Sequence, residues 1–139
     1  MLTPPSLSSH VVDRAFRAAN GELGIRREDI DVFLAACERD KVAIFGCEAW
    51  LVNHRAAFEG DPIPALGQWC GMIPMKGSDD PMVFSFGVDG PESNEPWSEF
   101  VRRSISEVRA ELSGFDPESE LPQKWLPHFR INFTIGLEH

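Results

Sequence analysis

The chain has 139 residues, of which 22 are acidic and 13 are basic, and its formal net charge at pH 7 is -9. This length is typical of a single domain with one core, and the acidic balance argues against binding to nucleic acid or anionic lipid, because both require clustered Lys and Arg. The three cysteines contain no C-x-x-C pair, which argues against a disulfide framework or a structural zinc site and favours a reducing cytoplasm. No segment is apolar enough over about 18 residues to predict a membrane helix, and the N-terminal residues have no export signal pattern.

Two helices are predicted at the start of the chain. Apolar residues recur at helical spacing from Pro5 to Asn20, and again from Arg27 to Arg39. Glu28 and Asp29 fall in the first turn of the second segment, where the helix dipole favours acidic side chains.

A long strand is predicted from Val42 to Asn53, where the hydrophobic period changes to two and β-branched and aromatic residues are frequent. Alternate side chains of a strand point to opposite sides of a sheet, so its two faces can be compared. The uniformly apolar face, which we expect in the core, carries Ala43, Phe45, Cys47, Ala49 and Leu51. The other face is mixed and carries Ile44, Gly46, Glu48, Trp50, Val52 and His54. Cys47 and Glu48 therefore point to opposite sides, which excludes a catalytic dyad between them.

The middle of the chain predicts a meander of short strands. The segment "EGDPIPALG", residues 59 to 67, is rich in Pro and Gly and predicts a loop. Two strands are then predicted, from Gln68 to Met75 and from Met82 to Val88, joined by a turn. The polar segment "DGPESNEP", residues 89 to 96, predicts a second loop.

The last third of the chain predicts one long helix and a final strand. Apolar residues follow helical spacing from Pro96 to Ser113, with Glu99 and Arg103 four residues apart in the order that favours an ion pair. The segment "DPESELPQKWLP", residues 116 to 127, predicts a loop, and "HFRINFTI" alternates as a half-buried strand.

These elements predict one α+β domain over residues 1–136. We expect a mostly antiparallel sheet of about four strands, two N-terminal helices and one long helix before the last strand. Leu137, Glu138 and His139 look like part of a purification tag and are left out of this domain.

No motif predicts a metal, a cofactor or a catalytic set. His10, His54 and His128 lie in different predicted elements, without the spacing of a metal-binding helix or a calcium loop. The glycines do not form a phosphate-binding loop. Burial is expected to raise the pKa of the Cys47 thiol, and Cys70 has no neighbouring base, so neither predicts a nucleophile.

Glu48 has three interpretations. It can act as a charge that protects an edge strand from aggregation, as the partner of a buried Arg, or as a binding or acid-base carboxylate.

The candidate partner-binding residues are aromatic and acidic. Tryptophan is enriched at interface hot spots, and Trp50 shares a predicted strand face with Glu48. The segment between Gly77 and Val101 contains acidic residues and no Lys or Arg, and such a surface attracts a basic partner. The predicted partner-binding set is Glu48, Trp50, Trp69, Asp79, Asp80, Glu92 and Glu95.

Four segments together resemble the immunity protein 40 family of bacterial polymorphic toxin systems. They are "IFGCEAWLV", "WCGMIP", "ESNEPWSEFVRRS" and "RINFTI", and the resemblance extends over roughly residues 25 to 135. It implies a non-enzymatic cytoplasmic protein that binds and neutralises a cognate toxin. Two alternatives remain open: a small-molecule-binding domain with an apolar pocket near Trp50 and Trp69, and a small hydrolase that uses Glu48.

Overall fold

The computed structural model describes residues 9–17, 22–52, 68–69, 73–74, 81–82, 85–120 and 123–138. The helical elements are α1 (Ser9–Arg14), the 3₁₀-helix η1 (Arg27–Asp29), α2 (Ile30–Arg39), α3 (Trp97–Ser113), α4 (Pro117–Glu120) and the 3₁₀-helix η2 (Gln123–His128). The strands are β1 (Phe16–Arg17), β2 (Leu23–Ile25), β3 (Ala43–Val52), β4 (Gln68–Trp69), β5 (Ile73–Pro74), β6 (Pro81–Met82), β7 (Ser85–Gly87) and β8 (Phe129–Gly136).

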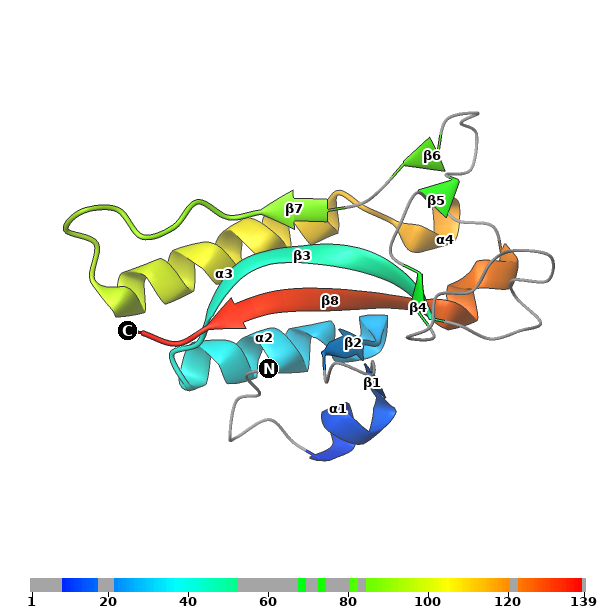
Figure 1. Ribbon diagram of the computed structural model, residues 1–139, viewed down its shortest axis with the longest axis horizontal. Helices are drawn as coiled ribbons and strands as arrows, with labels where there is room; N and C mark the ends of the chain where they lie inside the picture. Colours follow the sequence, from blue (N-terminus) through cyan, green and yellow to red (C-terminus); the bar gives the residue numbers. More distant parts are fainter. Residues whose placement is uncertain are drawn as a thin grey trace.

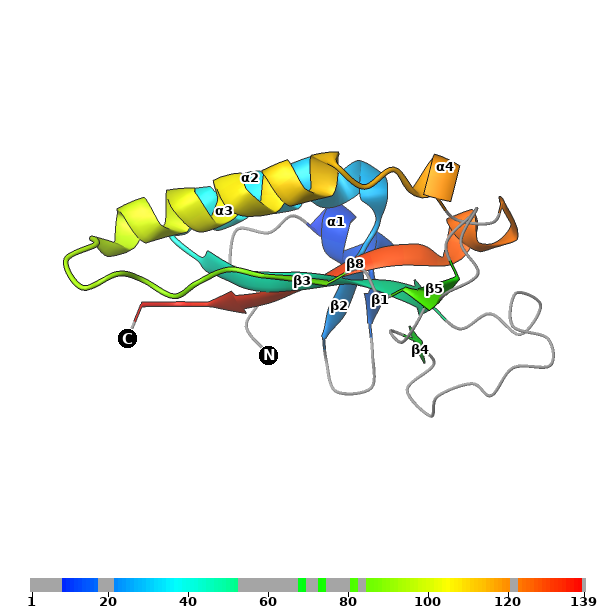
Figure 2. The same cartoon turned by 90° about the horizontal axis from the view of Figure 1, so that it is seen from above.

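The domain has two layers, an antiparallel sheet and a pair of helices (Figures 1 and 2). The sheet has the order β1-β2-β8-β3-β4, and β7 pairs with β3 on the same side as β4. Helices α2 and α3 lie side by side on one face, and β3 and β8 form the long central pair. The prediction of an α+β domain with a mostly antiparallel sheet is confirmed. Within the described residues, no helix has both the length and the apolar character needed to cross a bilayer.

The second and third predicted helices are present almost as expected. The segment from Arg27 to Arg39 begins with the single turn η1 and continues as α2, and α3 covers the predicted segment from Trp97 onward. The buried apolar residues of α3 follow the predicted stripe: Phe100, Val101, Ile105 and Val108. These helices were predictable because each has one apolar face over several turns.

The prediction of a helix from Pro5 to Asn20 is confirmed for Ser9–Arg14 and wrong for Phe16–Arg17, which form a strand. Helix α1 ends at Arg14, and Phe16–Arg17 pairs with Leu23–Ile25 as an antiparallel hairpin in which Phe16 lies opposite Gly24. The ring of Phe16 makes an edge-to-face contact with Trp50, with ring centroids 6.4 Å apart. Helical spacing is a local signal, and here the contact with a residue far along the chain favours the strand.

The middle of the chain contains shorter strands than expected. Segments β4 and β5 fall within the predicted strand from Gln68 to Met75, and β7 falls within the one from Met82 to Val88. The ribbon of β5 and β6 is separate from the main sheet. The predicted loop at residues 116 to 127 contains α4 and most of η2, and β2 had no recognisable pattern because it has only three residues.

A β-bulge changes the two faces of β3. The register with β8 shifts between Ile44 and Gly46, so Phe45 is an extra residue in the strand. Ile44 thereby joins Cys47 and Ala49 on the face that meets the helices, and it is fully buried. The prediction that Ile44 lies on the mixed face is wrong, because strict alternation cannot reveal a bulge. The ring of Phe45 packs against Phe100 of α3, with centroids 5.5 Å apart.

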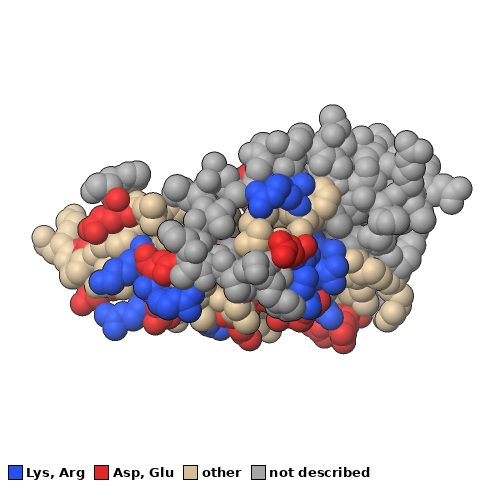
Figure 3. Space-filling view, turned by 90° about the horizontal axis from the view of Figure 1, so that it is seen from below, with Lys and Arg blue, Asp and Glu red and all other residues tan. Residues whose placement is uncertain are grey.

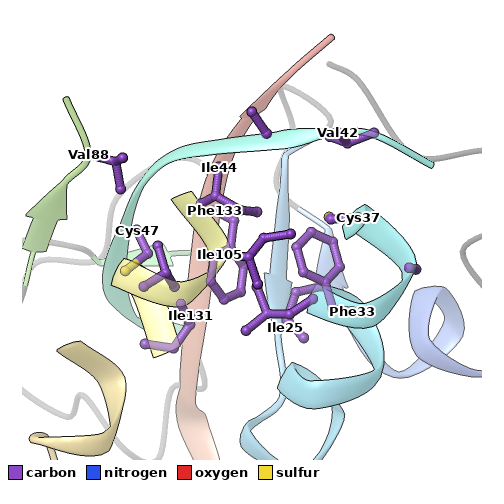
Figure 4. Packing of buried hydrophobic residues seen from close by; sticks show 14 of the residues in the cluster. Ile25, Phe33, Cys37, Val42, Ile44, Cys47, Val88, Ile105, Ile131 and Phe133 are labelled. Carbon is purple, nitrogen blue, oxygen red and sulfur yellow. The ribbon is translucent and has the colours of Figure 1, made fainter. Parts of the chain in front are cut away.

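The core fills the space between the sheet and the two helices (Figure 4). Phe33 of α2 stacks on Phe133 of β8 with ring centroids 4.9 Å apart, and Ile105 of α3 lies beside them. Cys37 and Cys47 are buried free thiols, and burial raises the pKa of each to about 12. The prediction that Cys47 lies in the core is confirmed, and its protonated thiol is a poor nucleophile.

Candidate partner-binding surface

The polar segment between β7 and α3 forms a loop at one end of the molecule (Figure 1). We call residues 89–95 the acidic loop, because three of its seven residues are acidic and none is basic. The loop closes in a turn in which the amide of Glu95 donates to the carbonyl of Glu92 at 3.0 Å. Pro96 then adopts extended dihedral angles and α3 begins at Trp97, with Glu99 in its first turn. A carboxylate at this position is favoured by the helix dipole.

Arg103 of α3 holds the acidic loop in place. Its guanidinium donates from Nε to Glu95 Oε2 and from Nη2 to Glu95 Oε1, both at 2.9 Å. Nη2 also donates to the carbonyl of Gly90 at 3.1 Å, and Nη1 donates to Glu107 at 2.8 Å. The guanidinium lies over the ring of Phe100, 5.0 Å from its centroid. The sequence predicted Glu99 as the partner of Arg103, which is wrong, because Glu95 and Glu107 occupy the guanidinium.

The carboxylate of Glu95 is therefore engaged in hydrogen bonds within the chain. Both of its carboxylate oxygens accept hydrogen bonds from Arg103, and Oε1 also accepts one from the amide of Glu92. The hydrogen bonds from Arg103, supported by that amide, lower the pKa of Glu95 to about 2. Glu95 shapes the loop, and its charge is largely balanced by Arg103.

The other carboxylates at this end of the molecule face solvent. Asp89, Glu92 and Glu99 are exposed, and within the described part of the chain none of them forms an ion pair. An open depression of about 480 Å³ lies beside Glu92 and Glu99. Its described lining is Glu92, Ser93, Asn94, Glu95 and Glu99.

Charges elsewhere on the described surface are more evenly mixed. On the side that carries α1 and α2, acidic and basic side chains are interspersed (Figure 3). Several of them form ion pairs, such as Arg14 with Glu28 at 2.8 Å and Arg109 with Asp31 at 2.7 Å. The acidic loop differs because no Lys or Arg occurs in the sequence from Asp89 to Val101.

Trp50 is fully buried, so the prediction that it lies on an exposed recognition surface is wrong. Its indole points to the sheet face away from α2 and α3, where Phe16 and Gly24 of the N-terminal hairpin contact it. In Figure 2 this hairpin runs steeply across the direction of β3 and β8. Sequence reasoning missed this contact because the hairpin itself was not predicted.

Glu48 is half-buried and accepts a hydrogen bond from the indole Nε1 of Trp50 at 3.1 Å. It does not protect an edge strand, since β3 has neighbours on both sides: Glu48 lies opposite Asn132 of β8 and Ser85 of β7. No ion pair of Glu48 occurs among the described residues, so nothing there supports a buried Arg partner. The carboxylate is engaged as an acceptor for Trp50.

The remaining predicted residues are only partly described. Trp69 lies on β4 with its backbone opposite Leu51, and its side chain lies outside the described residues. Asp79, Asp80 and His54 also lie outside the described residues. Of the predicted set, the structure therefore brings together Glu92 and Glu95, at the acidic loop, and separately Glu48 and Trp50.

Two residues important for this geometry had no clear sequence signal. Arg103 was recognisable as a helix residue with an acidic neighbour four positions away, but its contact with Glu95 depends on how the loop folds back. Gly24 belongs to no motif in the sequence, and only the close approach of Trp50 and Arg130 explains it. Among the described residues, no group of three His, Cys, Asp or Glu side chains could hold a metal ion.

Comparison of the chain with protein-family models, curated proteins and solved structures gave no match of any of the three kinds.

Proposed function

We propose that this chain is a non-enzymatic immunity protein that binds and neutralises a basic cognate toxin in the cytoplasm. We further propose that the toxin meets the surface formed by the acidic loop and Glu99. The observation that carries this proposal is the group of three exposed carboxylates, Asp89, Glu92 and Glu99, without ion-pair partners among the described residues.

The hydrogen bonds that join the acidic loop to α3 support this proposal. Arg103 links the loop to α3 through Glu95 and the carbonyl of Gly90, so the exposed carboxylates are held in position before a partner arrives. A preorganised surface loses less conformational entropy on binding than a mobile one. Unpaired charges also accelerate the encounter with an oppositely charged partner.

The chemistry of the interior supports a binding function over catalysis. The two described cysteines are buried, and burial raises the pKa of each thiol. The Glu48 carboxylate accepts a hydrogen bond from the indole of Trp50. A reducing cytoplasm suits buried free thiols.

Growth rescue in bacteria tests the proposal. The chain is co-expressed with the product of the neighbouring gene, and we expect it to restore growth that this product inhibits. The variant Asp89→Lys, Glu92→Lys, Glu99→Lys should lose rescue, because it replaces the three exposed carboxylates with positive charges.

A matched variant distinguishes a specific effect of the acidic loop on rescue from an effect of the net charge of the protein. Asp13, Glu38 and Glu111 are also exposed, have no ion pair among the described residues and lie outside the acidic loop. Changing these three to Lys alters the net charge equally and should leave rescue intact. Equal loss in both variants would contradict a role for the acidic loop, and failure of the unchanged chain to rescue would contradict neutralisation of that gene product.

A further inference from the structure

An apolar cavity lies at the opposite end of α3 from the acidic loop. Its volume is about 160 Å³. Its described apolar lining comes from α2, the C-terminal end of α3, the segment that follows it, and β8: Ile30, Leu112, Phe115, Pro117, Phe129 and Ile131. Arg27 of η1 is the one charged residue among the described residues that line it.

The floor of this cavity is buried and its walls reach the surface. Phe129 and Ile131 are 3% and 2% exposed. Ile30, Leu112 and Phe115 are half-buried, so the cavity opens towards solvent. The rings of Phe115 and Phe129 meet edge to face with centroids 5.6 Å apart. This arrangement suits another aromatic ring, since rings prefer edge-to-face and offset contacts.

The size of the cavity limits its ligand to about one ring. An engineered apolar cavity of roughly 150 Å³ binds benzene, which gives the scale for a single ring. The lining here is equally apolar over most of its surface. A single aromatic ring with a short substituent matches this volume.

The positive charge of Arg27 favours a ligand with a negative charge. Its Nη2 donates to Glu118 Oε1 at 3.1 Å, and the two side chains are 38% and 66% exposed. An exposed ion pair of this kind contributes little stability, so Glu118 can be replaced by another carboxylate. A guanidinium can bind a carboxylate through two parallel hydrogen bonds.

We propose that this cavity binds a small aromatic monocarboxylate. Its ring packs against Phe115 and Phe129 inside the cavity, and its carboxylate takes the place of Glu118 at Arg27. This site is separate from the acidic loop, because the two lie at opposite ends of a 17-residue helix, about 25 Å long at the usual rise per residue. The proposal therefore stands or falls independently of toxin neutralisation.

Titration of the full chain followed by amide NMR shifts tests this site. The probes are phenylacetate, toluene, which has no carboxylate, and acetate, which has no ring. We expect phenylacetate to produce saturable shifts around the cavity at lower concentration than either other probe. Arg27→Gln should weaken phenylacetate binding by about tenfold and leave toluene binding unchanged, because it removes one charge-assisted contact.

A control on the same helical layer isolates the role of Arg27. Arg109 also forms an exposed ion pair, with Asp31, and does not line the cavity. Arg109→Gln should leave the binding of all probes unchanged. Leu112→Trp should fill the cavity and abolish binding. If the Leu112→Trp variant does not fold, Ile30→Phe serves the same purpose.

Any one of the following results would overturn the proposal. The first is the absence of saturable shifts with phenylacetate at millimolar concentration. The second is phenylacetate binding that persists in a folded cavity-filling variant. The third is an equal effect of the Arg27 and Arg109 substitutions, or phenylacetate binding no tighter than toluene binding.

Discussion

Gly24 leaves room for the indole of Trp50 on the sheet face away from α2 and α3. A Cβ atom at position 24 would lie 2.9 Å from Trp50 Cε3 and 3.0 Å from Arg130 Cβ. Both distances are shorter than normal carbon contacts, and neither neighbour can move freely, because Trp50 is fully buried and Arg130 lies opposite it in β8. The hairpin β1–β2 can therefore approach Trp50 only with glycine at this position.

We expect Gly24→Ala to lower the free energy of unfolding by about 1–3 kcal/mol, the usual cost of overpacking a core position. Urea unfolding monitored by tryptophan fluorescence measures this change. Gly87→Ala is the control, since a Cβ there meets nothing within 4 Å. Equal stability of the Gly24 and Gly87 variants would contradict the close approach of the hairpin to Trp50.

Ser104 satisfies the backbone at the bulge of β3. Its Oγ accepts a hydrogen bond from the amide of Ile44 at 3.1 Å and donates one to the carbonyl of Val101 at 2.9 Å. Ile44 and Ser104 are both fully buried, so no water can replace this acceptor. A helix side chain thus completes the hydrogen bonding of an irregular strand.

We expect Ser104→Ala to lower the free energy of unfolding by about 1–3 kcal/mol, because a buried amide loses its acceptor. Ser113 provides a matched control, since its hydroxyl also donates to a carbonyl three residues earlier, that of Ala110 at 2.8 Å, but it is exposed. Ser113→Ala should change stability by less than about 0.5 kcal/mol. Thermal or urea unfolding of the two variants would refute the role of Ser104 if both behave alike.

At the scale of elements, the acidic loop and α3 form one unit through Arg103. The interaction depends on pH, because Glu95 must be ionised to accept both hydrogen bonds. The pKa of Glu95 is lowered from 4.5 to about 2 by Arg103 and the amide of Glu92. A carboxyl whose pKa is lower in the folded state contributes stability above its unfolded pKa, and this contribution is lost as the pH falls through the folded pKa. The link between loop and helix should therefore weaken between about pH 4.5 and pH 2.

NMR titration of the Glu95 side-chain carboxyl measures this link directly. We expect it to titrate near pH 2 in the unchanged chain and closer to its ordinary value in Arg103→Gln. Arg102→Gln, an exposed neighbour on α3 without an ion pair among the described residues, should leave the titration of Glu95 unchanged. The same titration curve in all three proteins would contradict the pairing of Arg103 with Glu95.

The elements differ in how well the sequence predicts them. Segments β3, α2, α3 and β8 were predictable because the apolar residues of each recur with a regular period over many consecutive residues. The N-terminal hairpin was not predictable, because Trp50 lies far along the chain from Phe16 and Gly24 and only their contact with it favours strands over helix. The acidic character of residues 89 to 99 was also predictable. The sequence did not reveal that Glu95 is paired while Glu92 is exposed, because this depends on where Arg103 lies.

At the scale of the whole molecule, α3 separates two regions of different chemistry. Its N-terminal end carries the acidic loop, and its C-terminal end borders the apolar cavity at Leu112. The core between them is formed by β3, β8, α2 and α3 and gives both regions a common rigid support. Partner binding at one end and small-molecule binding at the other can therefore be changed separately by substitution.

The association rate of the purified chain with its toxin, measured by stopped flow as a function of salt, tests the central claim most directly. We expect association of the unchanged chain to slow as ionic strength rises, because the screening length falls from about 30 Å at 0.01 M to about 3 Å at 1 M. The variant with Lys at positions 89, 92 and 99 should associate at least about tenfold more slowly at low salt and approach the rate of the unchanged chain at high salt. The same rate and the same salt dependence in both proteins would contradict recognition through the acidic loop.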